Sequence, residues 1–309
     1  MIIFLAGASG LVGSAVARAA ARRGHSVTGT VGSFAGRIEG LETQLTVDLA
    51  DEGATTGAVL DAFPEAIVNC AAVSVPEQSE ANPALAQTLN VALPTLLARL
   101  AHHVSARFVH LSSEQVFDGT PTRPYTSSDT PAPINLYGRQ KLASERAVHA
   151  AAAEFAVTLR VPLLMGNSAT GRRSNHERLF ADWAAGRTPR LFVDEYRQPC
   201  TAENLAEVIV ELCERQDVGL FHWAGTDLLS RHELGVQIRE HFKLSERQAP
   251  LEAVTRASQP EVMRKRQACL ALDIAPLTGM LKTRPQSMAE QLEELHVPPP
   301  CRGWYSAQS

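Results

Sequence analysis

The chain has few lysines and no long apolar stretch. Four lysines stand against 25 arginines in 309 residues, the basic residues are spread along the sequence, and the net charge is −4. Because the chain has no dense basic patch that could bind along a phosphate backbone, nucleic acid is not an expected partner. No segment reaches the ~20 apolar residues that cross a bilayer, so a membrane is not an expected partner either.

The cysteines and histidines lack the spacing of a metal or redox centre. The five cysteines are odd in number and far apart: Cys70, Cys200, Cys213, Cys269 and Cys301. The ten histidines show no ligand pattern, so no metal is expected. The opening run MIIFLA has no basic flank and ends early in a glycine turn, unlike a signal peptide. Reduced thiols and a cytoplasmic location are therefore expected.

Short apolar or β-branched runs alternate with longer helical patterns over the first two thirds of the chain. This alternation predicts an α/β fold of the Rossmann type, in which crossover helices wind both faces of a parallel sheet. Strands are expected at 2–6, 26–31, 45–49, 66–72, 107–113 and 156–161. Helices are expected at 11–23, at 83–102 and around Tyr137.

The rhythm breaks after about Gly166, where polar, arginine-rich stretches begin. We expect a dinucleotide-binding Rossmann domain at 1–165 and a smaller substrate-binding region at 166–309, part of which can return to the Rossmann sheet. Within it, 201–214 is predicted as an amphipathic helix capped by Thr201. No linker separates the two regions, so they are expected to share an interface.

A glycine-rich turn, GASGLVG, follows the first predicted strand and opens a helix. Gly7 allows a tight turn, Gly10 lets backbone N–H groups approach a diphosphate, and Gly13 lets helix and strand pack closely. The helix N-terminus then faces the anion with the positive end of its dipole. The pattern predicts dinucleotide binding, although glycines at such a turn can also be purely structural.

The segment after the second strand bears on the choice of coenzyme. NAD sites usually offer a carboxylate to the adenosine ribose here, but no acid lies between His25 and Ile38. Ser33 and Arg37 could instead face a 2′-phosphate, which favours NADP(H). Arg37 could equally be an ordinary surface residue, so NAD(H) stays open.

The segment YGRQK places Tyr137 and Lys141 four residues apart, on one face of a helix. The ammonium is expected to lower the phenol pKa, so that the tyrosine can exchange a proton. Ser112 and Ser113 end the preceding strand at the sheet edge where α/β sites form. A serine there could orient a substrate oxygen, although serines also end strands for structural reasons.

Five segments in this order, GASGLVG, VNCAA, HLSSEQVFDG, YGRQK and LRVP, resemble the extended short-chain dehydrogenase/reductase family. Within it, the chain is most similar to dTDP-4-dehydrorhamnose reductases and to regulatory β subunits of methionine adenosyltransferase. Further segments, such as GLFHWAGTDLLSRHEL, extend the resemblance over most of the chain. The glycine turn and Tyr-x-x-x-Lys belong to the whole superfamily, whereas VFDG and NLYG are narrower.

The resemblance implies Tyr137 as the acid/base, Lys141 as its electrostatic partner and a donor to the nicotinamide ribose, and Ser113 as the substrate-orienting hydroxyl. Together with the glycine turn and the NADP reasoning, it gives these expected cofactor contacts: Gly7, Ser9, Gly10, Leu11, Val12, Gly13, Ser33, Arg37, Asp48, Leu49, Cys70, Ala71, Ala72, Tyr137 and Lys141.

The chain departs from the reductase pattern on the sugar side. Ser113, Glu114 and Gln115 stand where those reductases usually have Thr-Asp-Tyr, and VPLLMG replaces a segment that often carries tryptophan. The expected function is NADP-preferring reduction of a carbonyl substrate, with a 4-keto nucleotide sugar as one candidate. The alternative is a cofactor-binding regulatory subunit or scaffold without turnover, and a homodimer stays open.

Overall fold

The computed structural model describes residues 1–259, 261 and 265–308. At its centre is a seven-stranded parallel sheet in the order β11-β6-β5-β4-β1-β2-β3. Its strands are β1 (Ile2–Ala6), β2 (Ser26–Val31), β3 (Thr43–Thr46), β4 (Ala66–Asn69), β5 (Arg107–Ser113), β6 (Ala156–Val161) and β11 (Gly219–His222). The order reverses direction at β1, which is the arrangement of a Rossmann-type fold.

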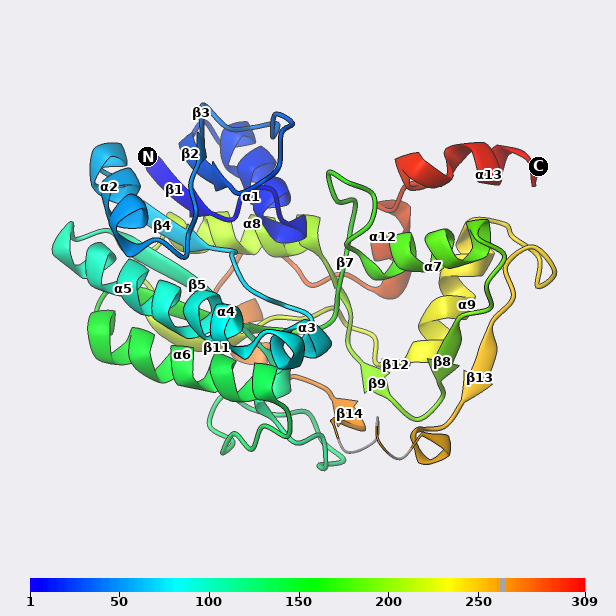
Figure 1. The fold of residues 1–309 in the computed structure, drawn as a ribbon. Coiled ribbons are helices and arrows are strands. Elements are labelled where there is room, and N and C mark those ends of the chain that lie inside the picture. The colour runs from blue at the N-terminus through cyan, green and yellow to red at the C-terminus, as the bar shows by residue number, and fades with distance from the viewer. Residues whose placement is uncertain (260, 262–264, 309) are drawn as a thin grey trace.

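Helices cover both faces of this sheet, as Figure 1 shows. On one face lie α1 (Leu11–Arg22) and α8 (Ala202–Cys213), which pack on each other and on one half of the apolar core. On the other lie α2 (Glu52–Ala62), α5 (Leu93–His103) and α6 (Leu136–Ala152). The central strands are therefore buried on both sides, which explains their nearly continuous apolar sequences.

A π-helical turn, η1 (Thr88–Ala92), joins α4 (Pro83–Gln87) to α5. It carries the fully buried Asn90, whose amide oxygen accepts a hydrogen bond from the backbone N–H of Val73 at 2.9 Å. The amide nitrogen donates to the Val73 carbonyl at 3.2 Å and to Oε1 of Gln140 at 3.0 Å. Asn90 thus connects the loop between β4 and α3 (Pro76–Ala81) to helix α6.

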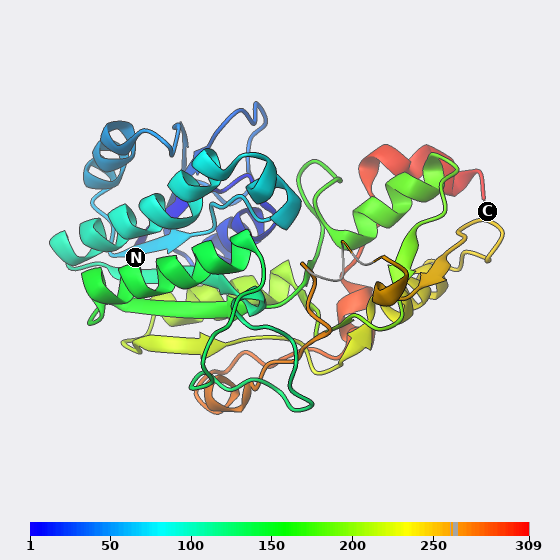
Figure 2. The same cartoon turned by 60° about the horizontal axis from the view of Figure 1, so that its bottom comes forward.

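Most of the remaining elements gather beyond one end of the sheet, as the turned view in Figure 2 shows. Their helices α7 (Asn175–Ala184), α9 (Arg231–His241), α12 (Met288–Glu293) and α13 (Arg302–Ser306) enclose a separate apolar cluster around Phe180 and Trp183. Short strands complete this part: β7 (Leu164–Met165), β8 (Arg190–Phe192), β9 (Tyr196–Arg197), β10 (Cys200–Thr201), β12 (Leu229–Ser230), β13 (Glu252–Val254) and β14 (Cys269–Leu270).

Three short helical turns, η2 (Glu114–Val116), η3 (Arg256–Ser258) and η4 (Pro299–Cys301), and α11 (Ala275–Thr278) complete the described elements. None of the helices in the described part of the chain is both long and apolar enough to cross a membrane. All five cysteines are unpaired thiols.

The predicted fold class is confirmed. The strands at 2–6, 26–31, 107–113 and 156–161 have the predicted bounds, whereas β3 begins and ends earlier than 45–49 and β4 ends at Asn69. The predicted helix at 201–214 is α8, and the side chain of Thr201 caps it by accepting from Asn204 N. Strand β11 is part of the Rossmann sheet and helix α8 packs on one face of it, although both follow Gly166 in sequence.

A buried ion pair fixes the end of β6 against α6. Arg160 and Glu145 form two bonds, Nη2 to Oε2 at 2.7 Å and Nε to Oε1 at 2.9 Å. Their side chains are only 2% and 8% exposed, and Ser112 donates a further hydrogen bond to the carboxylate. The Arg160 guanidinium also lies 4.8 Å from the ring centroid of Phe117.

We predict that Arg160→Met lowers the free energy of unfolding by about 3–5 kcal/mol, because it leaves the Glu145 carboxylate buried without its counter-charge. Arg187→Met is the matched control, since Arg187 is 62% exposed in its pair with Asp182 and should change stability by less than ~1 kcal/mol. Urea unfolding of the three proteins makes the measurement. Similar losses in both variants would show that burial does not set the cost.

Candidate functional site

The glycine turn after β1 is shaped by close backbone contacts. Gly7 has a φ of +82°, and a Cβ there would lie 2.9 Å from the backbone of Ala71. A Cβ on Gly13 would lie 2.2 Å from the Gly7 carbonyl oxygen, so both positions require glycine for the fold itself. Gly10 differs, because its Cβ would meet only the Gly7 oxygen, at 3.2 Å. Gly10 therefore leaves open space in front of the turn.

That space belongs to a cavity of about 400 Å³ at the carboxyl ends of β1 to β4. Nine of the predicted cofactor contacts line it: Gly7, Ser9, Gly10, Ser33, Asp48, Leu49, Cys70, Ala71 and Ala72. Leu11, Val12 and Gly13 form the first turn of α1 behind it. No side chain caps this helix N-terminus, so its first N–H groups are free to meet an anion.

Some cavity residues were not predicted, and six predicted contacts do not line it: Leu11, Val12, Gly13, Arg37, Tyr137 and Lys141. Thr30, Gly32, Val47, Leu89 and Arg173 complete the lining. Thr30 could have been found from its place near the end of the predicted strand 26–31. Val47 could not, because the predicted strand 45–49 has it at its centre whereas β3 ends at Thr46, and nothing local marks Arg173, which comes from the loop before α7. Arg37 is exposed in the loop after β2, apart from the cavity wall.

The predicted Ser-Tyr-Lys set lies beside this cavity, where β5 ends and α6 begins. Tyr137 lies next to Ser113, whose hydroxyl acts on the phenol pKa, and both side chains are buried. Lys141 is also buried, donates from Nζ to the Leu111 carbonyl at 2.8 Å, and lies 6.0 Å from the Tyr137 ring centroid. Its charge acts on the thiol of Cys70, a residue of the cavity wall.

The pKa of Tyr137 does not shift as the sequence suggested. Burial raises it to about 12, Ser113 opposes the rise, and Glu114 adds to it. The expected lowering by Lys141 is absent because the ammonium is turned toward Leu111. Burial also lowers the pKa of Lys141 to about 8, against the opposing charge of Glu145. Tyr137 is thus a neutral phenol at neutral pH, suited to donating a proton.

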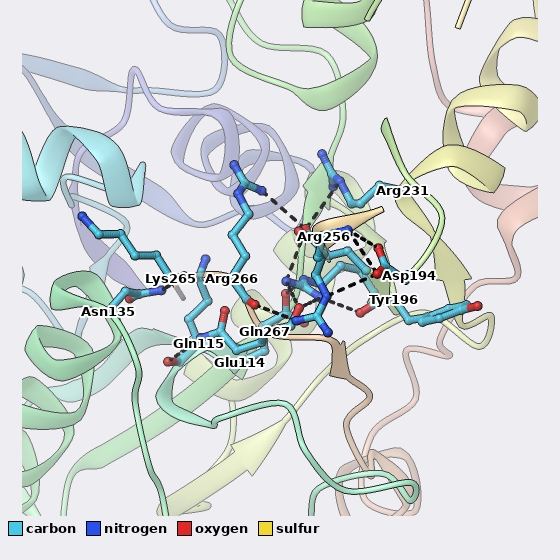
Figure 3. A network of polar contacts seen from close by, with 12 residues as sticks. Glu114, Gln115, Asn135, Asp194, Tyr196, Arg231, Arg256, Lys265, Arg266 and Gln267 are labelled. Carbon is cyan, nitrogen blue, oxygen red and sulfur yellow. Dashed lines mark hydrogen bonds and ion pairs between the residues drawn. The ribbon is translucent and has the colours of Figure 1, made fainter. Parts of the chain in front are cut away.

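Helix α6 begins with its backbone pressed against the turn that holds Ser113. A Cβ on Gly138 would lie 2.1 Å from the Gln115 carbonyl oxygen, so only glycine fits this contact. Asn135 caps the helix by accepting from Gly138 N at 2.8 Å. Its amide nitrogen donates to Gln115 Oε1 at 2.9 Å and to the Lys265 carbonyl at 3.2 Å, as Figure 3 shows.

A buried cluster of opposite charges adjoins the serine and the tyrosine. Glu114, the residue after Ser113, lies 3.3 Å from Nε of Arg197, whose Nη2 lies 3.3 Å from Glu195. Arg231 and Arg266 approach Glu195 at 3.9 and 3.4 Å. Figure 3 shows Glu114, Arg231 and Arg266 converging from three parts of the chain.

This cluster is incompletely satisfied in the described part of the molecule. Oε2 of Glu114 and of Glu195, and Nη1 of Arg231, are buried without a hydrogen-bond partner there. Burial raises the pKa of Glu114 to about 8, with Arg197 opposing the rise and Glu195 adding to it. Glu114 can therefore carry a proton near neutral pH and has a free oxygen for a polar ligand.

No group of three or more metal-ligating side chains occurs among the residues that the structure describes. The site is instead composed of a glycine turn, the buried side chains of Ser113, Tyr137 and Lys141, and a polar cluster beside them.

Comparison with known proteins gives a consistent set of relatives. The family model described as RmlD substrate binding domain matches residues 1–296. The probable low-salt glycan biosynthesis reductase Agl14 of Haloferax volcanii is 31% identical over 303 residues, covering 96% of this chain and 98% of that protein. Methionine adenosyltransferase 2 subunit beta of Xenopus laevis is 34% identical over 247 residues, 78% of this chain and 72% of that protein.

Among solved structures, dTDP-4-dehydrorhamnose reductase of Bacillus anthracis, in complex with NADP, superposes with a TM-score of 0.79. The two chains are 20% identical, and the match covers 94% of this chain and 97% of that one. At this identity the likeness shows the fold. The resemblance that the sequence motifs indicated, to dTDP-4-dehydrorhamnose reductases and methionine adenosyltransferase β subunits, is confirmed.

We predict that Glu114→Gln gains stability relative to the parent as pH rises from about 4.5 to about 8. The folded parent retains a carboxyl proton that the unfolded chain releases above its ordinary pKa. The parent's free energy of unfolding therefore falls across this window, by at most ~1.4 kcal/mol per pH unit, while glutamine does not titrate. Urea unfolding at steps through the window measures the difference between the two proteins.

Glu246→Gln serves as the control, because the Glu246 side chain is 86% exposed and its removal should give a small difference at every pH. A constant difference for Glu114→Gln over the same window would contradict the raised pKa.

Proposed function

Because the chain belongs to the RmlD substrate binding domain family, we propose that it is an NADP-preferring reductase of the short-chain dehydrogenase/reductase type. Its substrate would be a carbonyl compound of the 4-keto nucleotide sugar class. The observation that carries the proposal is the adjacent, buried side chains of Ser113 and Tyr137, with Lys141 6.0 Å from the tyrosine ring centroid, beside the cavity at the ends of β1 to β4. The reductase name of the Haloferax relative supports it.

The cavity fits a nicotinamide dinucleotide. The diphosphate would meet the uncapped N-terminus of α1 in the open space before Gly10. The wall formed by Cys70, Ala71 and Ala72 leads from there toward Lys141, whose charge reaches Cys70. Asp48 and Leu49 lie at the end of β3, where the adenine side would bind.

When bound, the coenzyme supplies the hydride for the carbonyl carbon. Tyr137 would donate its phenol proton to the carbonyl oxygen as the new C–H bond forms, so that the carbonyl becomes an alcohol. Ser113 would hydrogen-bond the same oxygen and orient it. The phenolate left on Tyr137 would be stabilised by Ser113 and by the ammonium of Lys141, which can approach it by leaving the Leu111 carbonyl.

A second cavity, of about 200 Å³, supports a nucleotide sugar as substrate. Its charged lining consists of three arginines, Arg178, Arg190 and Arg231, and one carboxylate, Asp182. Its apolar lining comes from leucine and isoleucine side chains of α7, β8 and α9 and from Pro189, which precedes β8. Guanidinium groups suit a diphosphate, and apolar walls suit a planar base. Arg231 also borders the charge cluster around Glu114, so the cavity is connected to the catalytic set through one side chain.

The preference for NADP rests on what faces the adenosine ribose. Ser33 and Gly32 line the cavity after β2, and no carboxylate lies between that strand and Ile38 to repel a 2′-phosphate. Arg37 lies in the same loop with an exposed side chain that could turn toward a bound phosphate. The five free thiols fit the proposed cytoplasmic location.

The second candidate is a dinucleotide-binding regulatory subunit without turnover. The observation that favours it is the 34% identity to a methionine adenosyltransferase β subunit. Both functions need the same dinucleotide cavity, so only turnover separates them.

We predict that NADPH binds about tenfold more tightly than NADH, and that Arg37→Ala removes this difference by weakening NADPH alone. A charge-assisted hydrogen bond to the 2′-phosphate is worth about 1.5 kcal/mol, which corresponds to roughly a factor of ten. Titration calorimetry with both coenzymes makes the measurement, and Arg99→Ala, on the exposed side of α5, is the control. Equal affinities for both coenzymes would rule out the preference.

We also predict that Tyr137→Phe lowers kcat by about 10²-fold or more with NADPH and a 4-keto nucleotide sugar, while NADPH affinity is retained. The ring and its packing remain, but no proton donor faces the carbonyl oxygen. Tyr305→Phe is the matched control, because the Tyr305 hydroxyl donates a hydrogen bond to the Phe242 carbonyl within the smaller region at 166–309, here called the second region.

The outcome distinguishes the two candidate functions. Undiminished turnover in Tyr137→Phe would refute the acid/base role. If the parent binds NADPH but reduces no member of a broad carbonyl panel, the regulatory function replaces the enzymatic one.

A further inference from the structure

One arginine of the cavity wall comes from the smaller region at 166–309 rather than from the Rossmann domain. Arg173 lies in the loop between β7 and α7, more than a hundred residues beyond the glycine turn, yet it lines the same cavity as Gly7, Ser9 and Gly10. No other lysine, arginine or histidine is among the described residues of this wall, and the single carboxylate there is Asp48.

The backbone of Arg173 is held firmly in place. The buried carboxylate of Glu177 accepts hydrogen bonds from the N–H groups of Arg173 at 2.6 Å, Ser174 at 2.8 Å and Ser168 at 2.7 Å. Ser174 also accepts from Gly166 N at 3.1 Å. The loop is therefore a fixed platform at the start of α7, and the arginine side chain extends from a constant position.

The guanidinium itself is unengaged: none of the residues that the structure describes forms a hydrogen bond or an ion pair with it. Its neighbour Arg172 provides a contrast. Arg172 does not line the cavity and instead acts electrostatically on the thiol of Cys301 in the second region. Two adjacent arginines thus face different parts of the molecule.

We propose that Arg173 pairs with the diphosphate of the bound dinucleotide, so that the second region contributes directly to coenzyme affinity. The inference rests on the proposed coenzyme binding. The N-terminus of α1 offers only about half a positive charge to a group that carries two negative charges. A guanidinium can supply the missing charge together with paired N–H donors. Bound coenzyme then joins the two regions across the cavity.

The diphosphate is common to NADPH and NADH, which separates this contact from two others. A contact with the 2′-phosphate would affect NADPH alone. If Arg173 instead contacted a substrate phosphate, its removal would leave coenzyme affinity unchanged and raise only the KM for the sugar. The comparison of both coenzymes with one set of variants therefore identifies the anion.

The test is titration of the full chain with NADPH and with NADH, by calorimetry, at low and at high ionic strength. Arg173→Ala should weaken both coenzymes by a similar factor of about ten at low salt, and less at high salt, where ion pairs are screened. Arg173→Lys should recover part of the loss. Arg172→Ala should bind both coenzymes as the parent does, and Gly10→Val should bind neither.

Unchanged affinities in Arg173→Ala, or a loss confined to NADPH, would overturn the inference. A loss equal in Arg172→Ala would overturn it too, because it would reflect general surface charge. These results are distinct from a failure of the proposed coenzyme binding, in which the parent itself would bind no coenzyme, and from a failure of the proposed turnover, in which the parent would bind both coenzymes but reduce no carbonyl.

Discussion

The close approach of helix α6 to the end of strand β5 is the constraint on which the site depends. At Gly138 the helix backbone comes so near to the Gln115 carbonyl that a Cβ would lie 2.1 Å from the oxygen. The contact is possible only because the residue after Tyr137 is glycine, and it brings the phenol to Ser113. It also directs Lys141 under the same strand end. Any larger residue at this position would move Tyr137 away from Ser113 while leaving the sheet intact.

What could be predicted from the sequence follows from local physics. The short apolar runs between helical segments predicted the strands, because a strand buried on both faces must be apolar throughout. Gly7 and Gly13 could be assigned because a strand-to-helix turn of this kind needs residues without side chains there. Tyr137 and Lys141 could be paired because helical spacing alone places them on one face. Each of these inferences uses residues that lie within one short segment of the chain.

What could not be predicted depends on contacts between distant segments. The cluster around Glu114 joins residues separated by up to about 150 positions, and no local pattern announces that these charges share a buried space. The pKa of Tyr137 was misjudged for the same reason. Helical spacing indicated a nearby ammonium, but the Leu111 carbonyl, which the spacing cannot reveal, holds that ammonium away. Burial then dominates the phenol.

The π-helical turn at Thr88–Ala92 has a consequence for the geometry of the whole helical segment. A π turn contains one more residue than an α turn, so the residues before and after it are rotated by about 100° relative to an uninterrupted α-helix. The extra residue lets Asn90 face inward to Val73 and Gln140, while Leu93, Leu97 and Leu100 still face the sheet. Removing one residue here would restore a regular helix but would force a choice between these two faces. Because of the π turn, the leucines that pack on the sheet and the hydrogen-bonding Asn90 are oriented separately. A substitution in one set can therefore be accommodated without moving the other.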